Sequence, residues 1–229
     1  MPSYKFMYFD GQAAGERTRY IFALAKVPYT DFRYPVTGDR AEFRKDQAEG
    51  KLAISLGKVP ILEVDGRRIA QSKAIERYLA KAFGMMGSDP FEEALVDMLC
   101  EHDRDLKDLY RKLDGLPEKE RQPAREKWFT QELPTMLAKI ELAVPSGPGP
   151  FLVGSRLSLA DIAFFVTISE WLVLYSPFAD DRKVAWHSTT LASACKNSPR
   201  LAASIEAMMR LPEVEAWRAK RSGPPGSRL

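Results

Sequence analysis

The chain has 229 residues, of which 45% are hydrophobic, 28% are charged and 10% are aromatic. These proportions are those of an ordinary globular protein of one or two domains, and they exclude a disulfide-stapled peptide and a disordered chain. The 34 basic and 31 acidic side chains leave a net charge of only +3, too weak to favour a nucleic acid partner. The first residues lack a secretion signal and no window has the length of a membrane span, so we expect a cytoplasmic protein that binds no membrane.

Cysteine and histidine are scarce. The chain contains two residues of each type, namely Cys100, Cys195, His102 and His187. None of them lies at metal-ligand spacing from another, and neither histidine accompanies a serine or cysteine nucleophile in a recognisable pattern. We therefore expect no metal, no disulfide framework and no chemistry based on imidazole.

The first 84 residues predict a small α/β unit. Their pattern indicates a strand at 4–9, a helix at 15–26, a strand at 29–36, a partly helical segment at 39–52, a hairpin of strands 61–64 and 67–70 around Asp65-Gly66, and a helix at 72–83. The order of elements is βαβαββα. This unit carries 15 basic and 10 acidic side chains, an excess that suits a small anionic ligand.

Beyond a connector at residues 84–90, helical periodicity replaces the strand signals. Helices are predicted at 91–113, 123–143, 159–174, 199–209 and 212–221. We therefore expect two domains, residues 1–84 and an all-helical bundle at residues 90–221, followed by a disordered tail at 222–229. Ser158 and Asp161 have the spacing of a capping box, which gives them a structural role at the start of the 159–174 helix.

Three features of the first domain have the chemistry of a binding site, although each also has a plainer explanation. Tyr8 ends the first strand, where a hydroxyl can reach a ligand crevice, but most strand aromatics only pack. A cis Val59-Pro60 bond would turn the Val59 backbone toward an extended peptide, whereas a simple strand-entry proline is commoner. Gln71-Ser72 opens a helix whose free amides suit a carboxylate or phosphate, with Ser72 as the predicted N-cap.

An acidic stripe recurs every four residues on the first long helix. Its members are Asp97, Glu101 and Asp105. Such runs are usually solvated faces, and the alternatives are an interface or a weak cation site.

The order of all these features resembles the cytosolic glutathione transferase family over essentially the whole chain. The opening residues 2–9, PSYKFMYF, and the segment 61–66, ILEVDG, are most similar to the sigma class among the members that use a tyrosine. The resemblance implies a thioredoxin-like domain that holds glutathione, the co-substrate, and an all-α domain that shapes the pocket for a small hydrophobic electrophile. It also implies a homodimer.

The resemblance further implies a role for each matching residue. Tyr8 would be catalytic, donating a hydrogen bond to the glutathione sulfur. The tripeptide would be held by Lys58-Val59-Pro60, by Gln71 and Ser72 at its γ-glutamyl carboxylate, and by Asp105 of the neighbouring subunit at its ammonium group. The family's tryptophan for the glycyl carboxylate is absent, and the candidate substitutes are Arg44, Lys45 and Lys51. The second-substrate pocket would take Phe9, Gly11 and Lys107.

The chain departs from the family pattern at two places. No arginine follows Tyr8 before Arg17, which argues against a second electrostatic donor to the sulfur, and Leu56 replaces the aromatic key of several classes, so a more polar dimer interface is expected. The alternative to an enzyme is a non-enzymatic protein of the same fold, crystallin-like or a binding module. The presence of Tyr8 and of Gln71-Ser72 favours the enzyme. A member with a cysteine nucleophile is disfavoured because both cysteines lie beyond the first domain.

Overall fold

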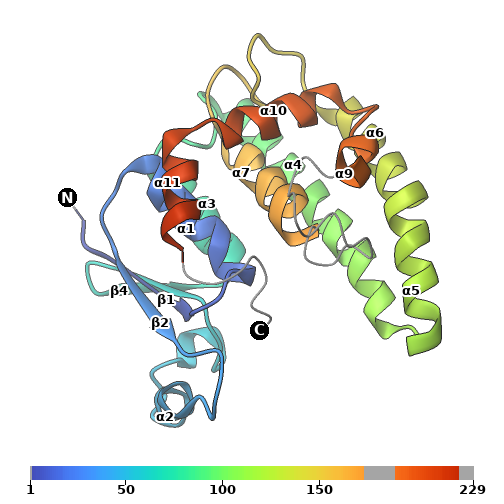
Figure 1. The fold of residues 1–229 in the computed structure, drawn as a ribbon. Coiled ribbons are helices and arrows are strands. Elements are labelled where there is room, and N and C mark those ends of the chain that lie inside the picture. The colour runs from blue at the N-terminus through green and yellow to red at the C-terminus, as the bar shows by residue number, and fades with distance from the viewer. Residues whose placement is uncertain (1, 173–188, 222–229) are drawn as a thin grey trace. The chain divides into compact units, whose positions relative to one another are not determined.

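The computed structural model describes residues 2–172 and 189–221 (Figure 1). The chain divides into two compact units: one ends at Phe83 and also takes in the helix that begins at Pro212, and the other runs from Gly84 to Leu211. Three predictions fall outside the described residues: the disordered tail at 222–229, the last two residues of the predicted 159–174 helix, and the surroundings of His187.

The first unit is built on a four-stranded mixed sheet. Its strands are β1 (Tyr4–Phe9), β2 (Thr30–Tyr34), β3 (Ile61–Val64) and β4 (Arg67–Ala70), in the order β2-β1-β3-β4. Strand β1 runs parallel to β2 and antiparallel to β3, and β3 and β4 form the predicted hairpin. A parallel pair needs a crossover connection, which the helix between β1 and β2 supplies. The predicted thioredoxin-like βαβαββα fold is confirmed.

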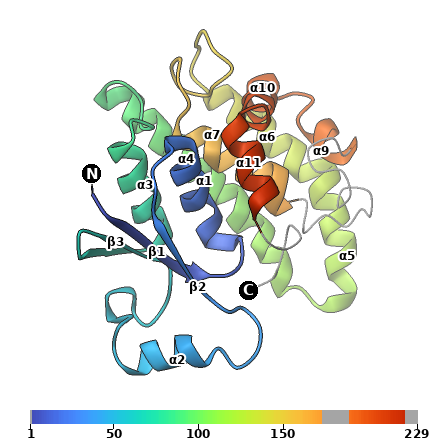
Figure 2. The same cartoon turned by 60° about the vertical axis from the view of Figure 1, so that its left-hand side comes forward.

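Helices α1 (Glu16–Ala25) and α3 (Ser72–Ala82) lie side by side, and α2 (Ala41–Ala48) lies away from them, below the sheet in the view of Figure 1. Helix α11 (Pro212–Lys220) packs beside α1 (Figure 2). The core of this unit joins the sheet to α1 and α3 through fully buried side chains, among them Phe6, Ile21, Leu62 and Leu79. Burial of these apolar surfaces is the main force that holds the unit together.

Two predictions about the first unit need correction. The N-cap of α3 is Gln71, with a positive φ of 72°, and Ser72 is the first helical residue, because the chain turns sharply out of β4 one residue earlier than expected. The sequence placed residues 212–221 in the helical domain, but α11 groups with the first unit. The physical reason is that Trp217 and Arg221 donate hydrogen bonds to the buried carboxylate of Glu16 on α1.

The described part of the second unit is all helical, as predicted. Its helices are α4 (Pro90–Arg111), α5 (Glu118–Lys127), α6 (Leu133–Ala143), α7 (Leu159–Val166), α9 (Thr189–Ala194) and α10 (Pro199–Met209). A π-helical segment, Trp128–Glu132, joins α5 to α6, and another, Thr167–Trp171, continues α7. Helices α4, α6, α7 and α10 surround the core of this unit.

The helix predicted at 123–143 begins earlier, at Glu118, so Pro123 lies inside α5. This is tolerated because the proline deprives only the Lys119 carbonyl of its usual donor, and Lys119 is exposed to water. Helix α9 was not predicted. The predicted capping box is confirmed: the Ser158 backbone and hydroxyl both donate to the Asp161 carboxylate, at 2.8 and 2.7 Å.

Candidate functional site

The strand register brings three of the predicted site residues to one end of the sheet. Met7 pairs with Ile61, and Ile61 pairs with Ala70. Tyr8 follows Met7, Pro60 precedes Ile61 on the antiparallel strand, and Gln71 follows Ala70, so the three residues occupy neighbouring positions at the same end of the strands. The Val59-Pro60 bond is cis, the isomer that the sequence left as one of two alternatives. The backbone of Tyr8, the cis proline and the start of α3 are therefore neighbours in the sheet.

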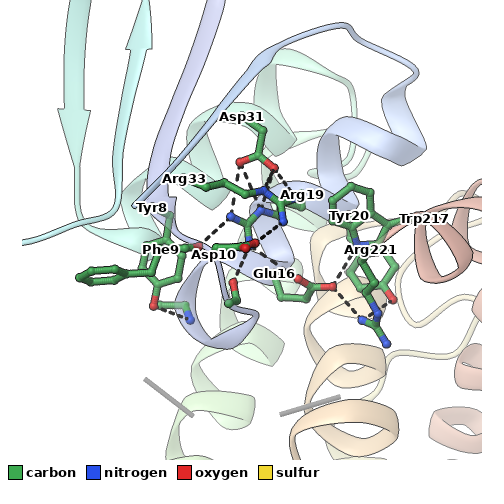
Figure 3. Close-up of polar contacts among 12 residues, drawn as sticks. Tyr8, Phe9, Asp10, Glu16, Arg19, Tyr20, Asp31, Arg33, Trp217 and Arg221 are labelled. Atoms are coloured by element: carbon green, nitrogen blue, oxygen red, sulfur yellow. Dashed lines mark hydrogen bonds and ion pairs between the residues drawn. The ribbon is translucent and has the colours of Figure 1, made fainter. Parts of the chain in front are cut away.

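The loop that follows β1 contacts both the ring and the hydroxyl of Tyr8. Only 3% of its surface is exposed, and its Oη accepts a hydrogen bond from the Ala14 N–H at 3.2 Å (Figure 3). The ring rests directly on Gly15, where an added Cβ would lie 2.4 Å from Tyr8 Cδ1. Within the described residues Tyr8 Oη accepts the hydrogen bond from Ala14 and donates to no group.

Burial raises the pKa of Tyr8, and the Ala14 N–H and the charge of Arg19 oppose that rise without cancelling it. The phenol is therefore protonated at neutral pH. A protonated phenol whose oxygen already accepts one bond is a hydrogen-bond donor, and it suits an anion placed opposite its hydroxyl.

Arg19, for which the sequence predicted no role, contacts the loop that follows β1. Arg19 is 1% exposed, and its Nη1 and Nη2 donate to the carbonyls of Gly11 and Phe9 at 2.5 and 3.0 Å. Its Nε donates to Asp31 at 3.1 Å, and Arg33 joins Asp31 to Asp10 (Figure 3). The sequence offers no clear signal, because Glu16 and Lys26 carry charges at helical spacing from Arg19.

A second buried contact ties the start of α1 to α11. The Glu16 carboxylate, 2% exposed, accepts a hydrogen bond from Trp217 Nε1 at 2.9 Å and one from Arg221 Nη1 at 2.8 Å (Figure 3). The same Arg221 nitrogen lies 3.4 Å from Tyr20 Oη. No sequence signal joins residues 201 and 205 positions apart, so these contacts were not predictable.

The start of α3 has the features of an anion site. Gln71 places no side-chain cap on the helix, so the first-turn amides stay available, and the helix dipole favours a carboxylate there. A non-glycine residue at positive φ costs about 1–3 kcal/mol, which marks Gln71 as a constrained position. Ser72 and Val59 are partly buried beside this edge, while Lys58 is exposed.

The candidate cations for the glycyl carboxylate differ in how far they are already engaged. Lys51 Nζ lies 2.8 Å from carboxylates of both Asp46 and Glu49, and these hydrogen bonds raise the lysine pKa. Lys45 Nζ lies 4.0 Å from Glu49. Arg44 is exposed and has no ion pair within the described residues.

Two further pocket candidates, Phe9 and Gly11, belong to the first unit. The Phe9 ring packs against Tyr8 and Phe43, with centroid distances of 5.8 and 4.9 Å, and the Arg40 guanidinium lies 5.1 Å from it. Gly11 is buried. Both are therefore fixed parts of the loop region around Tyr8.

The remaining candidates lie on α4 of the second unit. Asp105 is exposed and lies 3.5 Å from Arg104, and Lys107 Nζ lies 5.5 Å from the centre of the Trp171 ring. Asp97 and Glu101 complete the predicted stripe, yet the described residues contain no group of three histidine, cysteine, aspartate or glutamate side chains able to hold a metal. No helix in the described ranges is both long and apolar enough to span a membrane.

Comparison with known proteins agrees with this architecture. Residues 4–81 match the glutathione S-transferase N-terminal domain, and residues 104–221 match the glutathione S-transferase C-terminal domain. The chain is 29% identical to glutathione S-transferase 1 of Ascaris suum, covering 98% of this chain and 100% of that protein. It is 34% identical to haematopoietic prostaglandin D synthase of Gallus gallus, covering 96% and 98%. A solved structure of monomeric Na-GST-3 from Necator americanus is 30% identical, with a TM-score of 0.66 and coverage of 96% and 98%.

These matches span both units and define the class of protein. The chain belongs to the glutathione S-transferase family, whose members use glutathione as co-substrate. It is a glutathione transferase.

Proposed function

We propose that Tyr8 activates glutathione for attack on a small hydrophobic electrophile in the cytoplasm. The Tyr8 proton, which no described residue accepts, donates a hydrogen bond to the glutathione sulfur and stabilises the thiolate. The thiol first loses its proton to solvent, and the resulting thiolate is the nucleophile. With a chloronitrobenzene it forms the carbon–sulfur bond as the carbon–chlorine bond breaks and chloride leaves with the electron pair. The single observation that supports this assignment is a buried, protonated phenol at the end of the strands where Pro60 and Gln71 also lie.

The energy required is within reach of one such bond. Lowering a free thiol pKa of about 8.5 by two units needs ~2.7 kcal/mol of selective stabilisation of the anion. A hydrogen bond to a charged group contributes roughly 1.5–3 kcal/mol, more so where water is excluded. The Ala14 N–H polarises the phenol further, because it donates to the same oxygen.

The rest of the tripeptide has matching partners in the same unit. The Val59 backbone would pair with the cysteinyl residue, and the first turn of α3 at Gln71 and Ser72 would hold the γ-glutamyl carboxylate. Arg44, Lys45 or Lys51 would meet the glycyl carboxylate. This unit has an excess of basic over acidic side chains, which favours an anionic tripeptide.

We further propose a homodimer in which Asp105 of a second copy meets the γ-glutamyl ammonium group. Asp105 is exposed, and so is Leu56, at 82%, which suits the key-free interface expected for a sigma-like member. The solved relative described as monomeric makes oligomeric state a direct test. A dimer by light scattering supports this part, and a monomer with full activity contradicts it.

Tyr8→Phe tests the catalytic assignment because it removes only the hydroxyl. We expect turnover with a general chloronitrobenzene acceptor to fall about 100-fold, the equivalent of ~2.7 kcal/mol, with glutathione affinity within about threefold of the native value. The apparent pKa of the bound thiol, followed by thiolate absorbance, should rise by about two units.

Tyr4→Phe is the matched control, because Tyr4 is a second buried tyrosine on the same strand. It should leave turnover and the thiol pKa unchanged. If Tyr8→Phe behaves like Tyr4→Phe, then Tyr8 is only a packing residue and the mechanism is wrong.

A second candidate activity is prostaglandin D synthesis, favoured by the 34% identity to a protein of that name. It would use the same thiolate. Formation of prostaglandin D in the presence of glutathione, and its loss in Tyr8→Phe, would support this candidate.

A further inference from the structure

Two contacts to the Tyr8 hydroxyl and ring come from one loop, residues 10–15, whose last residues form the short 3₁₀ helix Ala13–Gly15. The ring also packs against Phe6 and Phe9 of its own strand. Ala14 donates its N–H to Tyr8 Oη at 3.2 Å, and Gly15 forms the surface on which the ring rests. A change in this loop therefore changes where the phenolic proton points. Among the loop residues only Gln12 has a buried side chain, so side-chain packing within the loop does little to fix its position.

The start of the loop is held by the buried guanidinium of Arg19, in addition to the backbone bond from the Asp10 N–H to the Tyr34 carbonyl and the ion pair between Arg33 and Asp10. Arg19 donates to the carbonyls of Phe9 and Gly11, which lie on either side of Asp10. The Asp31 carboxylate accepts a hydrogen bond from Arg19 Nε at 3.1 Å and thereby orients the planar guanidinium group. Arg19 does not bond to the Tyr8 hydroxyl, and its Cζ lies 5.9 Å from the centre of the Tyr8 ring.

The loop is fixed at its end by Glu16, the residue that follows Gly15. Its carboxylate is held by Trp217 and Arg221, whose bonds to it are 2.9 and 2.8 Å long. The side chains of Glu16 and Arg221 are only 2% and 7% exposed, so these bonds are protected from competition with water. Arg19 Nη1 lies 4.0 Å from the same carboxylate, which links the two anchors.

We propose that Arg19 is a positioning residue for the glutathione chemistry, and that Glu16 with Trp217 is a second anchor of the same loop. This inference rests on the proposed role of Tyr8. Arg19 acts through the Phe9 and Gly11 carbonyls on the loop, and the loop acts through Ala14 and Gly15 on the phenol. Catalytic groups must be held within about 0.5 Å of their working position, which a loop anchored at one end does not achieve.

The test is Arg19→Lys, which keeps the positive charge and replaces the planar guanidinium group with an ammonium group. One ammonium cannot satisfy Phe9, Gly11 and Asp31 in the same geometry, because they are arranged for separate guanidinium nitrogens. We expect kcat to fall about tenfold and the apparent pKa of bound glutathione thiol to rise by about one unit, while the dissociation constant for glutathione changes less than threefold.

Trp217→Phe tests the second anchor, since it removes one N–H and keeps an aromatic side chain. It should reduce kcat by about threefold and move the thiol pKa in the same direction. Asp31→Asn serves where Arg19→Lys fails to fold, because it keeps Arg19 and weakens the carboxylate that orients it, which also pairs with Arg33. Arg125→Lys is the matched control: Arg125 pairs with a carboxylate, Asp114, at 2.9 Å in the second unit.

The outcomes separate this inference from the proposed function. If Arg19→Lys lowers the unfolding midpoint but leaves kcat and the thiol pKa of the folded protein unchanged, Arg19 is merely structural and the inference is overturned. The same conclusion follows if Arg125→Lys produces an equal shift in the thiol pKa. If Tyr8→Phe leaves the thiol pKa unchanged, the proposed function fails first, and this inference fails with it.

Discussion

The contact between Gly15 and Tyr8 allows a perturbation of the phenol without touching the phenol itself. Gly15 has an ordinary backbone conformation, φ of −89° and ψ of −20°, so alanine is compatible with the backbone there. The new Cβ would lie 2.4 Å from Tyr8 Cδ1, whereas ordinary contacts begin at 3.4 Å. The ring must therefore move by about 1 Å.

A displacement of about 1 Å at a reacting group can cost on the order of 100-fold in rate. We expect Gly15→Ala to reduce kcat by 10- to 100-fold, to leave glutathione affinity within about threefold, and to lower the free energy of unfolding by about 1–3 kcal/mol through overpacking. Steady-state kinetics and urea unfolding on the same preparation measure the three quantities.

Gly115→Ala is the matched control, because a Cβ at Gly115 meets nothing within 4 Å. Combining Gly15→Ala with Tyr8→Phe should cost little more than Tyr8→Phe alone, since both act on one hydroxyl. Native turnover in a folded Gly15→Ala protein would refute the claim that the fixed position of Tyr8 matters.

Two further predictions concern the second unit. The buried Asp161 carboxylate accepts hydrogen bonds from Leu152, Ser158 and Ser204. Asp161→Asn should therefore lower the free energy of unfolding by about 3 kcal/mol, and Ser204→Ala by about 1 kcal/mol. Equal urea midpoints for the native protein and Asp161→Asn would contradict this. Burial raises the pKa of the Cys195 thiol to about 12, so it stays protonated at pH 8 and should resist a thiol reagent until urea unfolds the chain; rapid labelling of folded protein would show the reasoning to be wrong.

Local patterns in the sequence were sufficient for most elements. Strands β1, β3 and β4 have the predicted bounds, because a strand in a buried sheet and an Asp-Gly turn leave a signal in adjacent residues. The capping box at Ser158 and Asp161 was predictable for the same reason. The start of α5 was predicted wrongly because proline is common in the first turn of a helix. Here Pro123 lies inside the helix, where water can bond the Lys119 carbonyl that the proline leaves without a donor.

The site divides along the same line. Tyr8 was identified because it lies near the end of a strand, and Val59-Pro60 and Gln71 because they directly precede or follow one. The resemblance to a family then indicated their roles. The sheet register that places them at one edge, the buried fork of Arg19, and the attachment of α11 to Glu16 follow from contacts between residues distant in the chain.

The sequence by itself therefore determined the order of elements, the class of fold and the tyrosine whose hydroxyl is the candidate hydrogen-bond donor. The tertiary structure decided which contacts hold that hydroxyl and its ring in position. Hydrophobic periodicity is a property of neighbouring residues, whereas a hydrogen bond between Glu16 and Trp217 exists only after packing has brought two distant helices together and excluded water between them.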